Sequence, residues 1–98
     1  MTTDNPWMDE VEYKAYLEGE RKLYAWCLET YGGFDKKTAI EEAEEFYHYE
    51  SRDNQYRGLV FHDEAWHWAM MRIFGDMYWK SKPELEKPPT EYQAVSTH

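Results

Sequence analysis

Hydrophobic residues recur every three or four positions between residues 13 and 31, which is the spacing of one face of an α-helix. Asn5 and Pro6 have the chemistry of a helix start. Gly32 and Gly33 have the chemistry of a helix end. The pattern therefore predicts a long amphipathic helix over residues 6–31, whose stripe consists of Tyr13, Tyr16, Leu17, Tyr24, Cys27, Leu28 and Tyr31, with Glu20 as the one polar position. Because a buried tyrosine hydroxyl needs a hydrogen-bond partner, this face is predicted to be a core edge or a docking surface.

A second helix is predicted over residues 36–50, and two starts fit the sequence. Either Asp35 is the N-cap, or Thr38 opens a capping box with Glu41. The apolar side of this helix is formed by Ile40, Ala43, Phe46 and Tyr47. Its first turns are crowded by Glu41, Glu42, Glu44 and Glu45, where the positive end of the helix dipole stabilises carboxylates.

A third helix is predicted over residues 63–79, and it is apolar on nearly every face. One side carries Trp66, Met70, Ile73, Phe74 and Met77, and the opposite side carries Glu64, His67, Trp68, Met71 and Tyr78. A helix of this kind is normally covered on all sides by other helices or by a second subunit. The preceding run at residues 58–61 is too short to assign, and it fits either a brief extended segment or the lead-in to the helix.

Together these elements predict an all-α fold, a small three-helix bundle that forms one domain over residues 1–82. After Pro83 the composition changes to proline, lysine, glutamate, threonine and serine, which predicts a disordered tail over residues 83–98. Only two helices are left to cover the third one, so we expect a homodimer to complete the bundle. The residues expected to cross its interface are Trp66, Trp68, Met70, Met71 and Phe74.

The charge and the cysteine content narrow the class of partner and the compartment. A net charge of −9 and the lack of a basic stripe argue against direct nucleic-acid binding. The acidity fits either a cationic partner or a charge that only keeps a small protein soluble. Cys27 is the only cysteine, so no intrachain disulfide can form, and we expect it to be a small buried hydrophobe. No apolar run approaches the roughly 18 residues that span a membrane, and the first residues lack a signal peptide's features. We therefore expect a cytoplasmic protein that does not bind membranes.

Two Glu-x-x-His units, Glu45 to His48 and Glu64 to His67, are the first candidates for chemistry. Residues three apart on a helix project to one side, so each unit would present a carboxylate and an imidazole together. The spacing resembles the motif with which four-helix di-iron carboxylate proteins hold a dinuclear metal centre. This resemblance implies a divalent metal at these four residues, with the further glutamates supplied by a homodimer.

Glu41, Glu42 and Glu45 resemble the first carboxylate pattern of the all-α nucleotide pyrophosphohydrolases of the MazG type. The resemblance implies a helical hydrolase that holds Mg²⁺ with carboxylates from two facing helices. The second half of that pattern is a Glu-x-x-Asp on the next helix, whereas here Glu64 is followed by His67. Stabilisation by the helix dipole explains the same glutamates without catalysis.

Residues 61–68 bring histidines and tryptophans together, and Arg57 precedes them by a few positions. No nucleophile motif, glycine-rich phosphate loop or zinc-ligand spacing accompanies them, so no catalytic residue is assigned. Interfaces concentrate binding energy in tryptophan, tyrosine and arginine, which makes this cluster a candidate docking surface. Core packing is the commoner role of such residues, and both interpretations stay open.

Two hypotheses of function follow. The preferred one is a non-enzymatic interaction protein, such as an inhibitor or a nucleic-acid mimic, that binds a basic site on a protein partner. In composition it is similar to small acidic proteins of phages and mobile elements. Its partner-binding residues are predicted to be Glu41, Glu42, Glu44, Glu45, Tyr49, Arg57, Trp66 and Trp68, with no cofactor. The alternative is a metal-dependent protein, either the hydrolase or the redox site described above.

Overall fold

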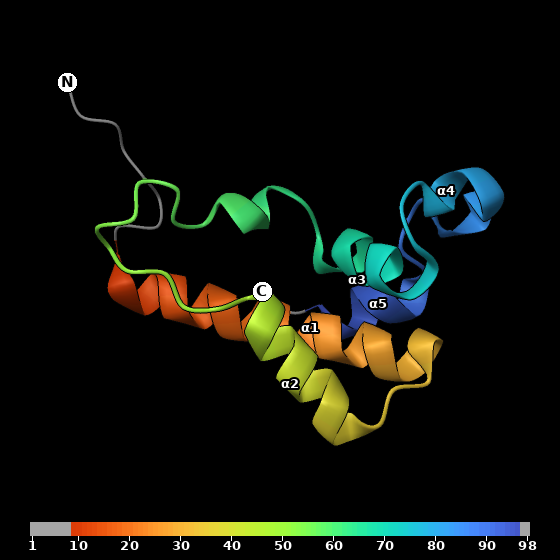
Figure 1. Ribbon diagram of the computed structural model, residues 1–98, viewed down its shortest axis with the longest axis horizontal. Helices are drawn as coiled ribbons and strands as arrows, with labels where there is room; N and C mark the ends of the chain where they lie inside the picture. The colour runs from red at the N-terminus through yellow and green to blue at the C-terminus, as the bar shows by residue number, and fades with distance from the viewer. Residues whose placement is uncertain (1–8, 97–98) are drawn as a thin grey trace.

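The computed structural model describes residues 9–96, and the regular elements in that range are all helices. They are α1 (Glu10–Gly32), α2 (Lys36–Phe46), η1 (Leu59–His62), α3 (Ala65–Phe74), α4 (Tyr78–Ser81), η2 (Pro83–Leu85) and α5 (Thr90–Val95), where η marks a 3₁₀ helix. The longest helix, α1, packs against α2, α3 and α5, so it forms the axis of the fold (Figure 1). The predicted all-α fold class is confirmed.

The ends of α1 are set by local capping. The predicted start at Asn5 lies outside the described residues, and α1 begins after Asp9, whose carboxylate accepts a hydrogen bond from the Glu12 backbone N–H at 3.1 Å. At the other end Gly33 has a φ of 71°, and its N–H donates to the Leu28 carbonyl. Glycine adopts this left-handed conformation without steric cost, so the glycine pair ends the helix where the sequence predicts.

The second helix uses the first of its two predicted starts, because the Asp35 carboxylate accepts a hydrogen bond from the Thr38 backbone N–H at 3.1 Å. It ends at Phe46, four residues before the predicted end at 50. Arg21 of α1 donates from Nε to the Tyr47 carbonyl at 2.9 Å, so this carbonyl is bonded to another helix. The predicted helix is too long, because the contact at its end joins residues far apart in the sequence and no local pattern shows it.

Residues 47–64 leave α2 and run back along α1 (Figure 1). The Glu50 backbone N–H donates to the Tyr13 hydroxyl at 2.8 Å, and the Phe61 ring lies 4.7 Å from the Tyr16 ring, centroid to centroid. Residues 59–62 form the 3₁₀ helix η1, so the unassigned run at 58–61 is not a strand. This segment therefore covers the first half of α1, around Tyr13 and Tyr16.

The third helix is shorter than predicted, since α3 ends at Phe74 and a separate turn of helix, α4, follows it. Gly75 has a φ of 92° and Met77 a φ of 61°, and neither value occurs inside a right-handed helix. The break redirects the chain so that Tyr78 is buried, with its hydroxyl 3.2 Å from Nδ1 of His67. Gly75 indicates this break in the sequence, but the hydrophobic pattern continues across it and predicts one long helix.

The disordered tail predicted over residues 83–98 is not confirmed. Residues 83–96 form η2, a connecting segment and α5, while residues 97–98 lie outside the described part. Tyr92 of α5 is only 3% exposed, and its hydroxyl accepts a hydrogen bond from the Trp66 backbone N–H at 3.3 Å. The Leu85 carbonyl accepts another from the Trp66 indole at 2.8 Å. A few apolar side chains in a polar segment are therefore enough to dock it on the core.

The same contacts bear on the expected homodimer, because they cover α3 within a single chain. Trp66 and Met70 are buried, Trp68 and Met71 are half-buried, and Phe74 is exposed. The sequence pattern leaves only two helices to cover the third, whereas in the structure η2 and α5 supply additional cover. The homodimer stays a prediction, with a smaller exposed surface to support it.

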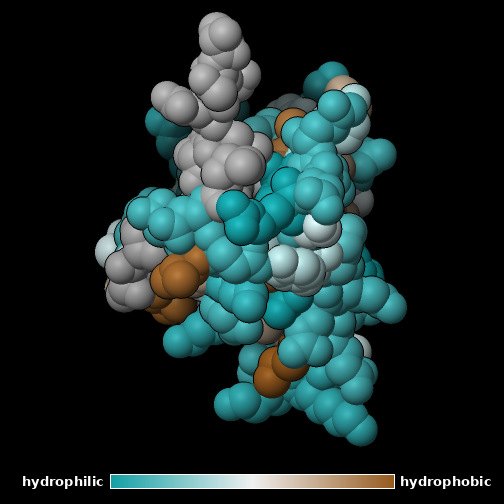
Figure 2. All heavy atoms as spheres, turned by 90° about the vertical axis from the view of Figure 1, so that its left-hand side faces the viewer, coloured by the Kyte–Doolittle hydropathy of each residue, from teal (hydrophilic) through white to brown (hydrophobic). Residues whose placement is uncertain are grey.

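The end of the molecule at which α1 begins is covered largely by hydrophilic residues, with few hydrophobic ones among them (Figure 2). In the described range, no helix combines the length and the apolar character that crossing a membrane requires. Acidic residues outnumber basic ones by 20 to 11 in the whole chain, so its surface is predominantly negative.

Candidate functional site

Three of the predicted partner-binding glutamates share the solvent side of α2. Ala39 and Ala43 are buried on the inner side of this helix, whereas Glu41, Glu44 and Glu45 are exposed. No ion pair within residues 9–96 involves any of these three carboxylates. We call this group the acidic face of α2.

Glu42 has a different role from its neighbours. Arg72 of α3 donates to it from Nε at 2.9 Å and from Nη2 at 3.3 Å, which is a bidentate pair between the two helices. The hydrogen bonds from Arg72 hold the pKa of the Glu42 carboxyl below its usual range. Glu42 therefore joins α2 to α3, and its charge is already compensated.

The predicted aromatic and arginine anchors separate into interior and surface residues. Trp66 and Arg57 are buried, so neither can contact a partner in this conformation. Trp68 is half-buried, and its indole N–H donates to the Val60 carbonyl at 3.0 Å. Tyr49 is exposed, and its hydroxyl donates to the Glu10 carboxylate. Of the four anchors, Tyr49 is the one that remains available on the surface.

The Glu-x-x-His units do not form the arrangement that their spacing implies. His48 lies beyond the end of α2, so Glu45 and His48 do not project from one helix. Glu64 is the N-cap of α3, and His67 has the Tyr78 hydroxyl and the Asp63 carboxylate as neighbours. Within the described residues there is no group of three or more histidine, cysteine, aspartate or glutamate side chains that could hold a metal ion.

The carboxylate pattern implied by the pyrophosphohydrolase resemblance is also divided. Glu41 and Glu45 are exposed, while Glu42 is held by Arg72.

Cys27 is buried, and burial raises the pKa of its thiol to about 12, so the reactive thiolate form is disfavoured. This confirms the expectation that Cys27 is a small buried hydrophobe.

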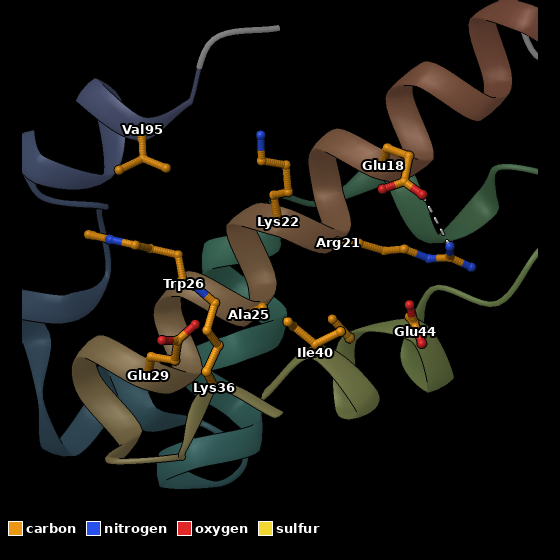
Figure 3. Close-up of a pocket in the computed structure, with 11 residues that line it drawn as sticks. Glu18, Arg21, Lys22, Ala25, Trp26, Glu29, Lys36, Ile40, Glu44 and Val95 are labelled. Carbon is orange, nitrogen blue, oxygen red and sulfur yellow. Dashed lines mark ion pairs between the residues drawn. The ribbon is translucent and has the colours of Figure 1, made fainter. Parts of the chain in front are cut away.

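A groove that the sequence pattern did not indicate lies beside the acidic face, between α1 and α2, with the end of α5 at its edge. Its volume is about 390 Å³. The apolar part of its lining consists of Ala25 and Trp26 of α1, Ile40 and Ala43 of α2, and Val95 of α5. In Figure 3 the Trp26 side chain lies on the same side of the groove as Val95, and Ile40 lies on the other side.

Charged residues of both signs surround this groove. They are Glu18, Arg21, Lys22, Glu29, Lys36 and Glu44. Arg21 is engaged on its own helix by the Glu18 carboxylate at 3.6 Å, as well as by the Tyr47 carbonyl. Glu44 belongs both to the groove and to the acidic face, so the two surfaces are continuous.

The sequence revealed the glutamates of this site but not its apolar half. Alanine, a half-buried tryptophan and a valine from the supposed tail have no shared pattern along the chain. Only the packing of α1 between α2 and α5 brings them together.

No protein-family model matches the chain, and neither a curated protein nor a solved structure is significantly similar to it.

Proposed function

We propose that this chain is a non-enzymatic interaction protein, which binds a basic surface of a partner protein through the acidic face of α2. The main support is that Glu41, Glu44 and Glu45 are exposed together with no ion pair among the described residues. Like charges three and four residues apart on a helix repel each other and destabilise it. A cationic partner offsets this repulsion, so the arrangement favours association.

An inhibitor that occupies a nucleic-acid-binding site of its partner is one form of this proposal. A row of carboxylates on a rigid helix presents negative charge to the same cationic side chains that neutralise phosphates. We also propose that the protein acts in the cytoplasm. Its single cysteine is buried and forms no intrachain disulfide, which is typical of proteins in a reducing compartment. The metal-dependent alternative has no comparable support, because Arg72 holds Glu42 and the Glu45–His48 unit is not helical.

Capture of the partner from a cell extract of the source organism tests the proposal. The wild type is compared with Glu41→Gln/Glu44→Gln/Glu45→Gln as bait. The matched control, Glu12→Gln/Glu84→Gln/Glu86→Gln, removes the same charge from exposed positions elsewhere. We expect one protein to be retained by the wild type and the control and lost by the variant of the acidic face.

Equal retention by all three baits would contradict the proposal. Metal analysis of the purified protein provides an independent check. A stoichiometric divalent ion that persists through purification would favour the metal-dependent alternative instead.

A further inference from the structure

We infer that the groove between α1 and α2 binds an amphipathic helix of the partner, with apolar side chains in the groove and basic side chains against the acidic face. This inference rests on the proposed function and names the kind of element that the site accepts. It follows from three features of the groove: its apolar lining, the lack of a strand edge nearby, and the distribution of charge around it.

The lining leaves apolar surface in contact with water. Ala25 of α1 and Ala43 of α2 are buried residues of the lining, and their small side chains leave room above them. Ile40 is 42% exposed and Val95 is 38% exposed, so the walls are incompletely covered. A volume of about 390 Å³ lies at the lower end of the range for binding sites, which is room for a few aliphatic side chains.

A helix is the element that fits these walls. Recognition by strand addition requires an unpaired strand edge, and residues 9–96 contain no strand. Grooves between helices instead accept apolar side chains that recur every three or four residues on a partner helix.

The acidic face beside the groove determines the side on which the basic residues of the partner lie. Ile40 and Glu44 are one turn apart on α2, so an apolar contact and a carboxylate are presented next to each other. Arg21 is held by Glu18 and is not free to repel a cation. Lys22 and Glu29 are exposed on the α1 wall, and Lys36 is exposed at the start of α2, so each wall carries both signs. The basic residues of the partner therefore face Glu41, Glu44 and Glu45, which have no ion pair among the described residues.

A synthetic probe tests this without the natural partner. The probe is a fluorescein-labelled peptide of about 14 residues, made of leucine and lysine in a helical amphipathic order. One comparison peptide has the same composition in a permuted order, and a second has glutamate in place of lysine. Fluorescence anisotropy measures the Kd of each peptide, and amide shifts in NMR spectra locate the contact. We expect the ordered leucine–lysine peptide to bind more tightly than both comparisons.

Variants then separate the groove from the acidic face. Ile40→Asn/Val95→Asn should weaken binding about tenfold, because two apolar contacts become polar. The matched control is Val11→Asn/Leu59→Asn, which changes two exposed apolar residues outside the groove and should leave the Kd within about twofold. Circular dichroism confirms that each variant is folded.

Two charge variants test the electrostatic part of the inference. Lys22→Gln should tighten binding of the leucine–lysine peptide by a few fold, since it removes a repelling charge on the α1 wall. Glu41→Gln/Glu45→Gln should weaken binding at low salt, as the proposed function requires.

The outcomes for the two proposals are distinct. Unchanged binding to Ile40→Asn/Val95→Asn, or equal binding of the permuted peptide, overturns the groove inference even if the glutamate variant binds weakly. Unchanged binding to Glu41→Gln/Glu45→Gln, with the groove variant impaired, contradicts the acidic face as the electrostatic determinant. Amide shifts confined to other parts of the chain also overturn the inference.

Discussion

The guanidinium of Arg57 lies 3.8 Å from the centre of the Tyr13 ring, and its Nη2 donates to the Glu10 carboxylate at 2.7 Å. The residue is 3% exposed, so its role is to hold the 47–64 segment on α1. Arginine is frequent in binding hot spots, which made Arg57 a candidate for the interface. Its partner Glu10 is 47 positions away in the chain, and no local pattern indicates such a contact.

Replacement of Arg57 by alanine should lower the free energy of unfolding by about 2–4 kcal/mol, because the stacking on Tyr13 and the packing of the stem are lost together. Arg57→Met should cost less, since it keeps the stem and removes Nε and Nη1, which have no hydrogen-bond partner in the described part of the chain. Urea unfolding measures both changes. Arg52→Ala, at an exposed neighbouring position, is the control and should change stability by less than about 0.5 kcal/mol.

The contact between Arg57 and the Glu10 carboxylate should depend on pH, because a carboxyl group titrates. The hydrogen bond from Tyr49, and then the one from Arg57, lower the pKa of the Glu10 carboxyl from its ordinary value of 4.5. A carboxyl whose pKa is lower in the folded state stabilises the fold fully above its ordinary pKa, and this contribution disappears as the pH falls through the lowered value.

The difference in unfolding free energy between the wild type and Glu10→Gln should therefore be constant above the ordinary pKa and shrink below it. Urea unfolding at a series of pH values down to about 3 measures this difference. Glu12→Gln, at an exposed position, is the control. A difference that stays constant in acid would show that the carboxylate is not the group that binds Arg57 and Tyr49.

At the scale of the elements, the sequence predicted what local chemistry determines. The end of α1 at the glycine pair and the start of α2 at Asp35 follow from capping groups a few residues away. The early end of α2 and the docking of α5 depend on contacts with distant residues, Arg21 for the former and Trp66 for the latter. Composition alone predicted disorder for the C-terminal segment, because it does not show which surface Tyr92 can reach.

The order of this segment has a direct test. Tyr92→Ala should lower the free energy of unfolding by about 3 kcal/mol, since it removes a buried aromatic side chain and leaves a cavity beside Trp66. Gln93→Ala, at the exposed neighbouring position, should have little effect. Thermal or urea unfolding followed by circular dichroism compares the two. If both variants are as stable as the wild type, α5 does not contribute to the fold.

At the scale of the whole molecule, the fold brings the acidic face of α2 and the apolar groove together. The glutamates were visible in the sequence because they occupy consecutive turns of one helix. The groove was not, because its lining comes from three helices. In the proposed function, the carboxylates attract the partner and the apolar groove retains it.

The oligomeric state is a second property of the whole molecule. Light scattering at tens of micromolar should give twice the mass of the chain if the homodimer forms. The exposed apolar residues near the end of α3 and the turn after it, Phe74 and Met77, are then its first candidates for contact. Phe74→Asn/Met77→Asn should shift the mass to that of a monomer, whereas a wild type that is monomeric at this concentration excludes the homodimer.

We propose that the acidic face of α2 attracts a cationic partner protein. The association rate of the captured partner at low and high salt, compared between the wild type and Glu41→Gln/Glu44→Gln/Glu45→Gln, is the decisive measurement. Exposed charges act over roughly 8 Å at physiological salt, so they influence the encounter more than the bound complex. We expect slower association and a flatter salt dependence of the association rate for the variant, with a nearly unchanged dissociation rate. Equal association rates for the two proteins at both salt concentrations would contradict it.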